Sequence, residues 1–177
     1  MFSKILVALD QGDTCAPLFK EAVTLAQATD AALMLLSVIA PEGQESLTIP
    51  ASSGLVYYPL STSETIWEVY QKHFREYEAQ SLERLRNFCE EATSLGLRAE
   101  FTQSFGSPER VICDLAGTWE ADLIMVGSHQ RTGVSEWVMG SVSSYVMHHA
   151  PCSVLVFNAP TSPQETVETA ELATVEG

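Results

Sequence analysis

Apolar residues gather in five short runs, and the stretches between them carry apolar positions at helical spacing. The runs 2–9, 31–39 and 122–126 are almost continuously apolar, which is typical of strands buried on both faces of a sheet. The run 97–104 instead alternates apolar and polar residues, as an edge or half-exposed strand does. The run 150–157 supplies a fifth strand. The pattern therefore predicts five strands.

Helix-start residues stand between the strands. Asp13 or Thr14 is suited to cap a helix after the first strand, and Pro17 falls in its first turn. Ser107 and Pro108 form the same signature after the alternating strand. These residues predict a helix after each of the two strands.

A longer helix is predicted between the second strand and the alternating strand. Ser61 and Glu64 have the spacing of a capping box, in which each side chain bonds to the backbone of the other residue. Apolar residues recur from Ile66 to Leu95, and Gly96 is the expected C-terminal glycine. A fourth helix is expected over 141–149.

Strands that alternate with helices fold into an open α/β sheet. The first two strands and the helix between them form a β-α-β unit, whose crossover is right-handed. The expected fold class is therefore α/β: an open, five-stranded parallel sheet with helices on both faces.

The segment between the fourth strand and the last helix has the composition of a phosphate-binding loop. Gly127 ends the strand, and the run from Gly140 to Ser143 opens the helix. Glycine lets the backbone approach an anion, while a helix N-terminus offers unpaired N–H groups and the positive end of its dipole. We expect the Ser141 and Ser143 hydroxyls to add donors on the same side.

Three polar segments are expected to meet at one edge of the sheet. Asp10 and Asp13 follow the first strand, residues 37–40 end the second, and the loop 127–143 follows the fourth. In open α/β sheets, ligands bind beyond the carboxyl ends of the strands, where the strand order reverses. This edge is therefore the predicted binding site. Asp13 has a competing role as a helix cap.

Composition narrows the possible partners. The 177-residue chain has a net charge of −14, which disfavours a nucleic-acid partner because such proteins need a basic face. It has no apolar run of the roughly 20 residues needed to span a membrane, and its first residues lack a signal-peptide cleavage site. We expect a cytoplasmic protein without a membrane partner.

Cysteine spacing is the second compositional constraint. Cys15, Cys89, Cys113 and Cys152 are scattered and form no Cys-x-x-Cys pair. Such spacing is poor for a zinc site or a disulfide framework, so we expect reduced thiols.

Two segments are expected to lie outside the packed domain, which spans 1–157. Residues 40–62 contain several prolines, glycines and serines and form a long loop. This loop is either a disordered insertion or a flap near the ligand, with Tyr57 and Tyr58 as contacts. Residues 158–177 carry glutamates and no basic residue, so we expect a disordered acidic tail.

Three motifs carry a family resemblance. The chain opens with Lys-Ile-Leu-Val-Ala-Leu-Asp, has Ala-Asp-Leu-Ile-Met-Val-Gly-Ser at its fourth strand, and closes with Gly-Ser-Val-Ser followed by His-Ala-Pro-Cys-Ser-Val-Leu-Val. With these motifs, residues 1–157 resemble the universal stress proteins. The resemblance implies a Rossmann-like fold of the adenine nucleotide alpha hydrolase-like type. It also implies a dimeric, adenine-nucleotide-binding regulator of a stress response or signalling.

One position departs from the family's nucleotide motif. ATP-binding members carry Gly-x-x-Gly, nine further residues, and then Gly-Ser or Gly-Thr. Gly127, Gly140 and Ser141 match in register, but Gln130 replaces the second glycine. A glutamine hinders both a positive φ and close approach to phosphate. We therefore hypothesise that adenosine binding is kept while the triphosphate grip is altered in favour of AMP or ADP.

The resemblance also implies the site residues. Asp10 would contact the ribose, Val38 would meet adenine through its backbone, and the glycine motif would surround the phosphates. The cofactor-binding candidates are Ala8, Asp10, Val38, Met125, Gly127, Ser128, His129, Gln130, Arg131, Gly133, Gly140, Ser141, Val142 and Ser143. The implied cofactor is ATP, AMP or ADP, with or without Mg²⁺. No catalytic residue and no metal site made by protein ligands is predicted.

Partners and activity remain open between three hypotheses. The resemblance implies a homodimer that pairs through residues Val154 to Phe157, which agrees with the hazard of an unpaired apolar edge strand. One alternative is a slow ATPase in which Asp10 holds a metal, although the sequence shows neither a P-loop nor an evident general base. The other is an interaction protein that has lost its ligand; Gln130 favours it and the retained Gly140–Ser143 motif opposes it. No stress signal or protein partner is identified.

Overall fold

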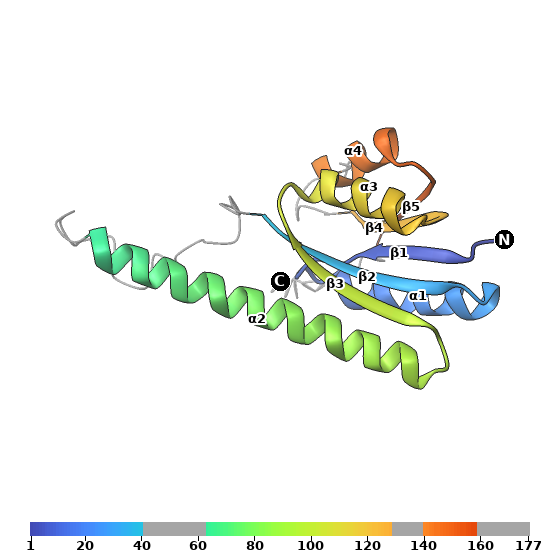
Figure 1. Cartoon of the computed structure of the whole chain (residues 1–177), viewed down its shortest axis with the longest axis horizontal. Coiled ribbons are helices and arrows are strands. Elements are labelled where there is room, and N and C mark those ends of the chain that lie inside the picture. The colour runs from blue at the N-terminus through green and yellow to red at the C-terminus, as the bar shows by residue number, and fades with distance from the viewer. Residues whose placement is uncertain (41–62, 129–139, 159–177) are drawn as a thin grey trace, which may run out of the picture.

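The sheet has five strands, all of them parallel (Figure 1). The computed structural model describes residues 1–40, 63–128 and 140–158, without the side chains of residues 63–70 and 73. The strand order is β3-β2-β1-β4-β5. The strands are β1 (Lys4–Ala8), β2 (Ala32–Ile39), β3 (Ala99–Phe105), β4 (Leu123–Gly127) and β5 (Ser153–Phe157). The predicted five-stranded parallel sheet is confirmed.

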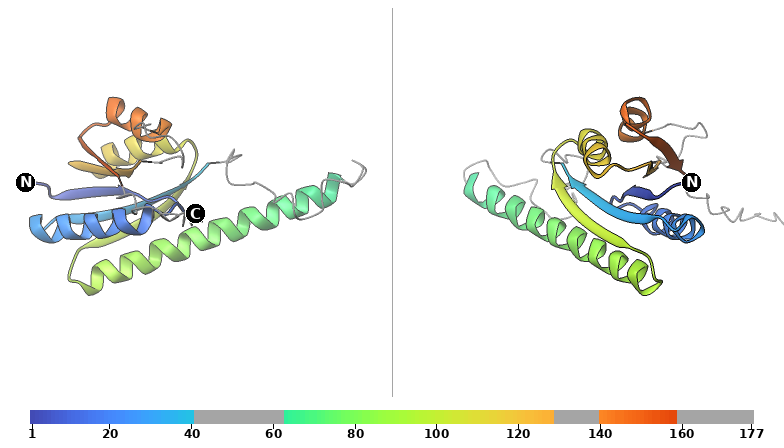
Figure 2. Two further views of the ribbon diagram at one scale, coloured as in Figure 1. Left: turned by 180° about the vertical axis from the view of Figure 1, so that it is seen from behind. Right: turned by 45° about the vertical axis from the view of Figure 1, so that its right-hand side comes forward.

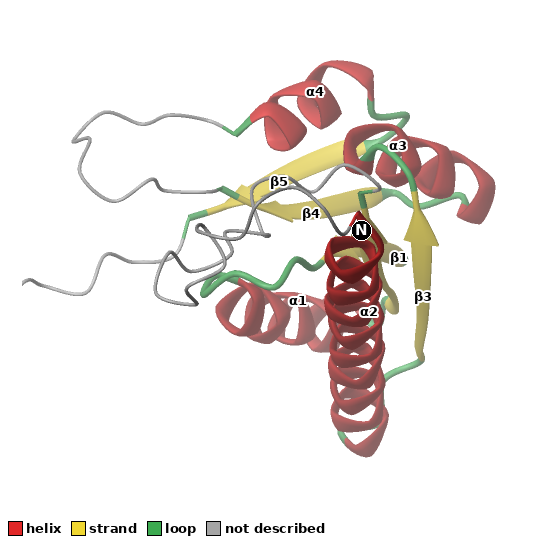
Figure 3. Cartoon of the chain, turned by 90° about the vertical axis from the view of Figure 1, so that its left-hand side faces the viewer, coloured by secondary structure: helices red, strands yellow, loops and turns green. Residues whose placement is uncertain are grey.

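Helices cover both faces of the sheet, as Figure 3 shows. They are α1 (Cys15–Thr29), α2 (Ser63–Ser94), α3 (Pro108–Trp119) and α4 (Ser141–His149). The first two pack on one face, and α3 and α4 pack on the other. The α/β fold class expected from the sequence is therefore confirmed. The loop 41–62 and the tail 159–177 lie outside the described residues.

The alternation of side chains along β1 separates two core layers. Ile5 and Val7 lie in the layer covered by α1 and α2, whereas Leu6 lies in the layer covered by α3 and α4. All three side chains are fully buried. Successive strand residues point to opposite faces, so a strand covered on both sides must be apolar throughout. This explains the continuous apolar runs.

The two edge strands differ from the central ones. Every residue of β3 is only partly buried or exposed, and Phe105 at its end is 56% exposed. The alternating pattern of 97–104 predicted this half-exposed edge, and the prediction is confirmed. At the opposite edge, β5 pairs with β4 alone and leaves Leu155 37% exposed.

Two helices begin at the predicted residues, but the expected side-chain capping hydrogen bonds are not formed. Thr14 and Ser107 are the N-cap residues of α1 and α3, and Pro108 opens α3. Neither N-cap side chain hydrogen-bonds to its helix. The prediction that these side chains cap the helices is therefore wrong, although their positions are correct. Ser61 lies outside the described residues, so its capping box stays a prediction.

The helix α2 extends well beyond the sheet. Figure 2 shows its N-terminal part reaching past the ends of the strands, whereas its C-terminal half lies along the sheet. There the rings of Phe88 and Phe19 stack with centroids 4.3 Å apart. One turn before Leu85, Ser81 shares a buried 2.7 Å hydrogen bond with Ser37 of β2. The C-terminal half therefore anchors the helix.

Candidate functional site

The strand order reverses between β1 and β4. The chain runs from β1 to β2 and β3 on one side, and then to β4 and β5 on the other. Ala8 of β1 is level with Val126 of β4, so the two strands end together. The helix that follows β1, α1, packs on one face of the sheet, and the helix that follows β4, α4, packs on the other. Such a point is where open α/β sheets form a binding crevice.

Asp10 enters this edge from the loop after β1. Its side chain is exposed, and Oδ1 accepts a 2.9 Å hydrogen bond from the backbone N–H of Gly12. A turn of this kind holds the carboxylate in one orientation. The same loop is tied to α2, because Gln11 Nε2 donates to the backbone oxygen of Tyr77 at 3.2 Å.

Gly127 ends β4 against the beginning of α1. A Cβ atom placed on Gly127 would lie 3.1 Å from Oγ1 of Thr14, which is closer than most Cβ contacts. The glycine therefore allows the end of β4 to approach the first turn of α1. The end of β4 and the start of α1 are thus brought together by packing, next to the pairing of β1 with β4.

Ser128, the next residue, is bonded to the end of β5. Its backbone N–H donates to the carbonyl oxygen of Phe157 at 2.9 Å, and its hydroxyl donates to the side-chain oxygen of Asn158. The side chain of Ser128 is buried. The residue predicted to begin the phosphate loop is therefore held by the edge strand.

The helix α4 begins at the same edge with a glycine. Gly140 is its N-cap and has extended backbone angles. Because glycine has no side chain, it leaves the first amides of the helix uncapped. Ser141 is exposed, whereas Ser143 is buried and its hydroxyl donates to the Gly140 carbonyl at 3.0 Å. In this structure the Ser143 hydroxyl bonds within its own helix turn, whereas Ser141 is exposed.

Other candidates occupy less open positions. Ala8 and Val38 are half-buried at the ends of β1 and β2, and Val142 packs against the layer of α3 and α4. Met125 is 1% exposed, and its side chain belongs to the core layer covered by α1 and α2. Asp13 is exposed beside the start of α1. His129, Gln130, Arg131 and Gly133 lie outside the described residues.

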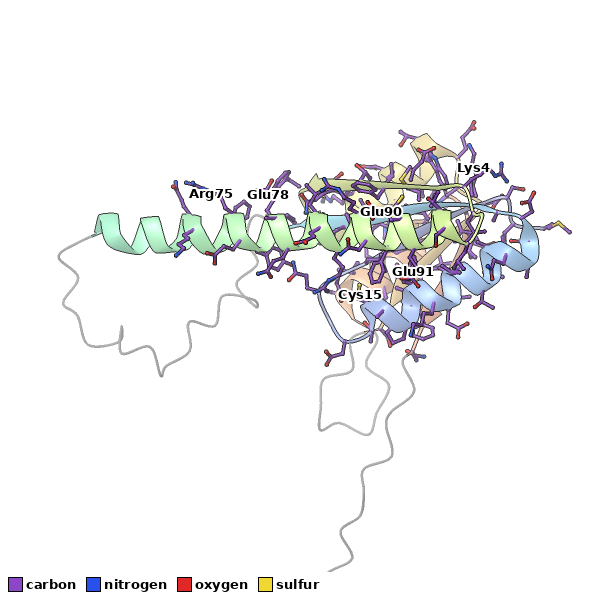
Figure 4. The ribbon with its side chains drawn as sticks, turned by 90° about the horizontal axis from the view of Figure 1, so that it is seen from below. Lys4, Cys15, Arg75, Glu78, Glu90 and Glu91 are labelled. Carbon is purple, nitrogen blue, oxygen red and sulfur yellow. The ribbon has the colours of Figure 1, made fainter. Side chains whose placement is uncertain are left out.

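Charged and titratable side chains gather beneath the Asp10 loop. Cys15 is the first residue of α1 (Figure 4), and burial raises the pKa of its thiol. The negative charge of Asp10 raises this pKa further, whereas a hydrogen bond from Arg84 lowers it. Burial also raises the pKa of Tyr77, with Asp10 acting in the same sense and Arg84 against it. Tyr77 and Arg84 thus lie near the site on α2.

Sequence reasoning missed four of these neighbours. Tyr77 and Arg84 come from a helix about seventy residues after Asp10, so no local pattern connects them with that residue. Thr14 was considered only as a helix cap. Asn158 was assigned to the tail, but the structure describes it and bonds it to Ser128. Its position directly after the last strand is the one signal that places it at this edge.

Metal ligands are not clustered in the described ranges. Across 1–40, 63–128 and 140–158, no three histidine, cysteine, aspartate or glutamate side chains are arranged to hold a metal ion. Within the same ranges, no helix is both long enough and apolar enough to cross a membrane.

Residues 1–158 match the model of the universal stress protein family. A relative from Synechocystis, universal stress protein Sll1388, is 32% identical over 155 residues, which cover 88% of this chain and 97% of the relative. The matched residues extend to Asn158, one residue beyond the expected domain end.

Solved structures show the same fold. Universal stress protein UspA from Lactobacillus plantarum has a TM-score of 0.67 and 26% identity, covering 88% of this chain and 97% of that protein. A universal stress protein family protein from Arabidopsis thaliana, solved with AMP bound, has a TM-score of 0.58 and 19% identity, covering 92% and 97%. At that identity the second likeness shows the fold alone.

Proposed function

The chain belongs to the universal stress protein family, and from this premise we propose that it binds an adenine nucleotide at the sheet edge where β1 and β4 end. The observation that carries the proposal is the arrangement at this edge. An exposed carboxylate follows β1, and a helix with an uncapped glycine start follows β4. The AMP bound by the Arabidopsis protein supports adenine as the base.

The phosphates would bind at the start of α4. The backbone N–H groups of Ser141, Val142 and Ser143 belong to the first turn and have no partner within the helix. Together with the helix dipole they favour an anion. The exposed hydroxyl of Ser141 would add a donor, whereas Ser143 would contribute through its backbone alone because its hydroxyl bonds to Gly140.

The geometry of Gly140 fits a phosphate at this position. Its φ is −61°, which any residue adopts, and a Cβ there would lie 3.6 Å from Ser143 Oγ, an ordinary contact. The described chain therefore does not need glycine at this position. A ligand that approaches the backbone closely does need it.

The ribose would bind at Asp10. The carboxylate is exposed and oriented by the Gly12 amide, so it can accept hydrogen bonds from ribose hydroxyls. If Mg²⁺ accompanies the phosphates, Asp10 is also a suitable oxygen ligand for it. Adenine would lie toward the end of β2, near Val38. A bound nucleotide would supply the hydroxyl, phosphate and base groups that these residues recognise, and the proposal includes no hydrolysis.

A regulatory role would follow from dimerisation at β5. This strand is an edge of the sheet, and Leu155 is exposed on it. An exposed apolar edge strand is suited to pair with a second copy of itself. Nucleotide binding at the adjacent end of β4 would then shift the dimer equilibrium and so act as a stress-response or signalling output. A cytoplasmic location belongs to the same proposal.

Two substitutions of Asp10 test the ribose contact. Asp10→Asn keeps an oxygen that accepts from Gly12, whereas Asp10→Ala removes both the turn and the acceptor. We expect Asp10→Ala to weaken AMP binding by about tenfold or more and Asp10→Asn to weaken it less. Isothermal titration with adenosine, AMP, ADP and ATP measures both effects, and mass spectrometry of the denatured wild-type protein identifies any nucleotide that co-purifies.

Three outcomes would contradict the proposal or part of it. If neither co-purified nucleotide nor titratable binding is found, the interaction-protein alternative replaces it. If binding is unchanged in Asp10→Ala, the ribose lies elsewhere. If wild type releases phosphate from ATP above a blank with metal and buffer, and Asp10→Ala does not, the ATPase alternative is supported.

A further inference from the structure

We infer that Gln11 is a positioning residue for the ribose half of the proposed nucleotide site, because its side chain fixes the loop that carries Asp10 against α2. The inference rests on the proposed function, in which Asp10 accepts hydrogen bonds from the ribose. Gln11 acts through the loop and not through a contact with the ligand.

The Asp10 loop, between β1 and α1, is held at both ends by backbone hydrogen bonds. The N–H of Leu9 donates to the carbonyl of Leu36 in β2 at 2.8 Å. The N–H of Cys15, at the start of α1, donates to the carbonyl of Gly12 at 3.1 Å. Between these points the Asp10 carboxylate accepts from the Gly12 amide at 2.9 Å. Because that bond lies within the loop, it orients the carboxylate relative to the loop and not relative to the rest of the molecule.

Gln11 ties the middle of this loop to α2. Its Nε2 donates to the backbone oxygen of Tyr77 at 3.2 Å, and the bond is partly buried. A side-chain amide is suited to this task, because it donates to a carbonyl without placing a charge next to the Asp10 carboxylate. Burial raises the pKa of Tyr77 and the charge of Asp10 raises it further, which agrees with a carboxylate close to this helix turn.

The turn of α2 that receives this bond is itself fixed to the sheet. Ser81 shares a buried 2.7 Å hydrogen bond with Ser37 of β2. Nε2 of Gln103 in β3 donates to the backbone oxygen of Glu78 at 3.1 Å. The bond from Gln11 therefore ends at a support that β2 and β3 hold in place.

A fixed loop matters most for the ribose hydroxyls. A carboxylate that is held in position before the ligand arrives binds more tightly, because less ordering remains to be done on binding. The proposed contacts of adenine, near Val38, and of the phosphates, at the start of α4, belong to other segments. Loss of the Gln11 bond should therefore weaken recognition of the ribose hydroxyls selectively.

The test compares two nucleotides that differ only in the ribose hydroxyls. AMP and its dideoxy analogue, which lacks both hydroxyls, are titrated calorimetrically into the full-length wild type and into Gln11→Met. Methionine keeps the length of the side chain but cannot donate a hydrogen bond. The readout is the ratio of the two affinities, because a merely structural role would weaken both ligands and leave this ratio unchanged.

Gln103→Met is the matched control. It makes the same substitution and removes the same kind of bond to a backbone oxygen of the same α2 turn, but from β3 instead of the Asp10 loop. The bond between Ser81 and Ser37 still holds the turn in this variant. Asp10→Ala and the double variant of Asp10→Ala with Gln11→Met complete a mutant cycle.

We expect wild type to prefer AMP over the dideoxy analogue by about tenfold or more, and Gln11→Met to reduce this preference by about threefold to tenfold, the effect of one lost hydrogen bond. Gln103→Met should keep the wild-type preference. In Asp10→Ala the preference should be largely lost, and adding Gln11→Met should lower it no further, because both changes act on the same contact.

The outcomes separate this inference from the proposed function. If wild type binds neither nucleotide, the proposed function fails and this inference with it. If wild type binds both equally, the ribose contact at Asp10 fails, and the inference is overturned. If wild type prefers AMP and Gln11→Met keeps the full preference, the inference alone is overturned. An equal loss of preference in Gln103→Met would trace the effect to α2 as a whole and overturn it as well.

Discussion

Gly140 is a glycine that the fold itself does not require but that close approach of a ligand would. Its backbone angles suit any amino acid, and the space around it admits a Cβ. Gly127 is different, because a Cβ there would approach Thr14 to 3.1 Å. Substitutions at Gly127 therefore disturb packing, whereas substitutions at Gly140 test whether a ligand approaches the backbone there.

Gly140→Ser should make the protein slightly more stable and its phosphate binding weaker. A serine at the N-cap accepts a hydrogen bond from an amide of the first turn and raises the free energy of unfolding by a few tenths of a kcal/mol. The same amide is then lost to phosphate, so ATP affinity should fall by about tenfold or more. Urea unfolding and calorimetric titration measure the two effects.

Gly140→Ala is the companion variant. Alanine is a poor N-cap, so it should lower stability by about 0.5–1 kcal/mol while also hindering phosphate. Binding lost in Gly140→Ala but kept in Gly140→Ser would show that stability, not ligand approach, controls binding. That result would contradict the proposed phosphate position.

At the scale of elements, the ends of the helices carry backbone strain. Three helices are followed by a residue in the left-handed region: Asp30 at φ 54°, Gly96 at φ 84° and Glu120 at φ 57°. A residue with a Cβ is disfavoured there, and glycine is the usual choice. The glycine after α2 follows this rule, and the ends of α1 and α3 depart from it.

Substitutions at two of these ends should have opposite effects. Gly96→Ala meets no atom within 4 Å, so its expected loss of about 1–2 kcal/mol in the free energy of unfolding is purely conformational. Glu120→Gly should instead gain about 1 kcal/mol. The 3.6 Å pair between Lys4 and Glu120 is exposed and offsets little of this gain.

Urea denaturation of the two variants and the wild type provides the measurement. Thr118→Ala, on the exposed side of the last turn of α3, is a control for changes at that helix end that leave φ unaltered. A loss of stability in Glu120→Gly would contradict the assignment of strain to this position.

At the scale of the whole molecule, folding raises the pKa of five ionisable groups among the residues that the structure describes. Burial raises the pKa of Cys15, Cys89, Cys113 and Cys152 above the ordinary 9.0, and that of Tyr77 above the ordinary 10.0. Between the unfolded and folded values, the unfolded chain binds fewer protons than the folded one. Ionisation then favours unfolding.

The free energy of unfolding should therefore fall as pH rises. The contribution of these groups is fully present below pH 9.0 and is lost as pH increases through the raised values of the folded protein. Urea denaturation between pH 7.5 and about 10.5 measures the slope. In Cys15→Ala the slope above pH 9.0 should be shallower, although its stability at neutral pH is lower. An unchanged slope would contradict the neutral buried thiol.

The sequence by itself determined the elements and the family. Continuous apolar runs arise because strands covered on both faces must bury every side chain, and the alternating run arises because β3 is an edge. The candidate positions Asp10, Gly127 and Gly140 were also visible in the sequence. Each is an acidic residue or a glycine next to the end of a strand or the start of a helix, which the local pattern reveals.

Tertiary structure alone decided which side chains come together at the candidate site and which hydrogen bonds they form. The strand order places the ends of β1 and β4 next to each other, and packing brings Gly127 to Thr14. It also directs the Ser143 hydroxyl into its own helix turn and bonds Ser128 to Asn158. These contacts depend on distances between segments far apart in the chain. A local sequence pattern reflects the conformational propensity of each residue. A contact between two distant segments forms only when the folded sheet brings them together.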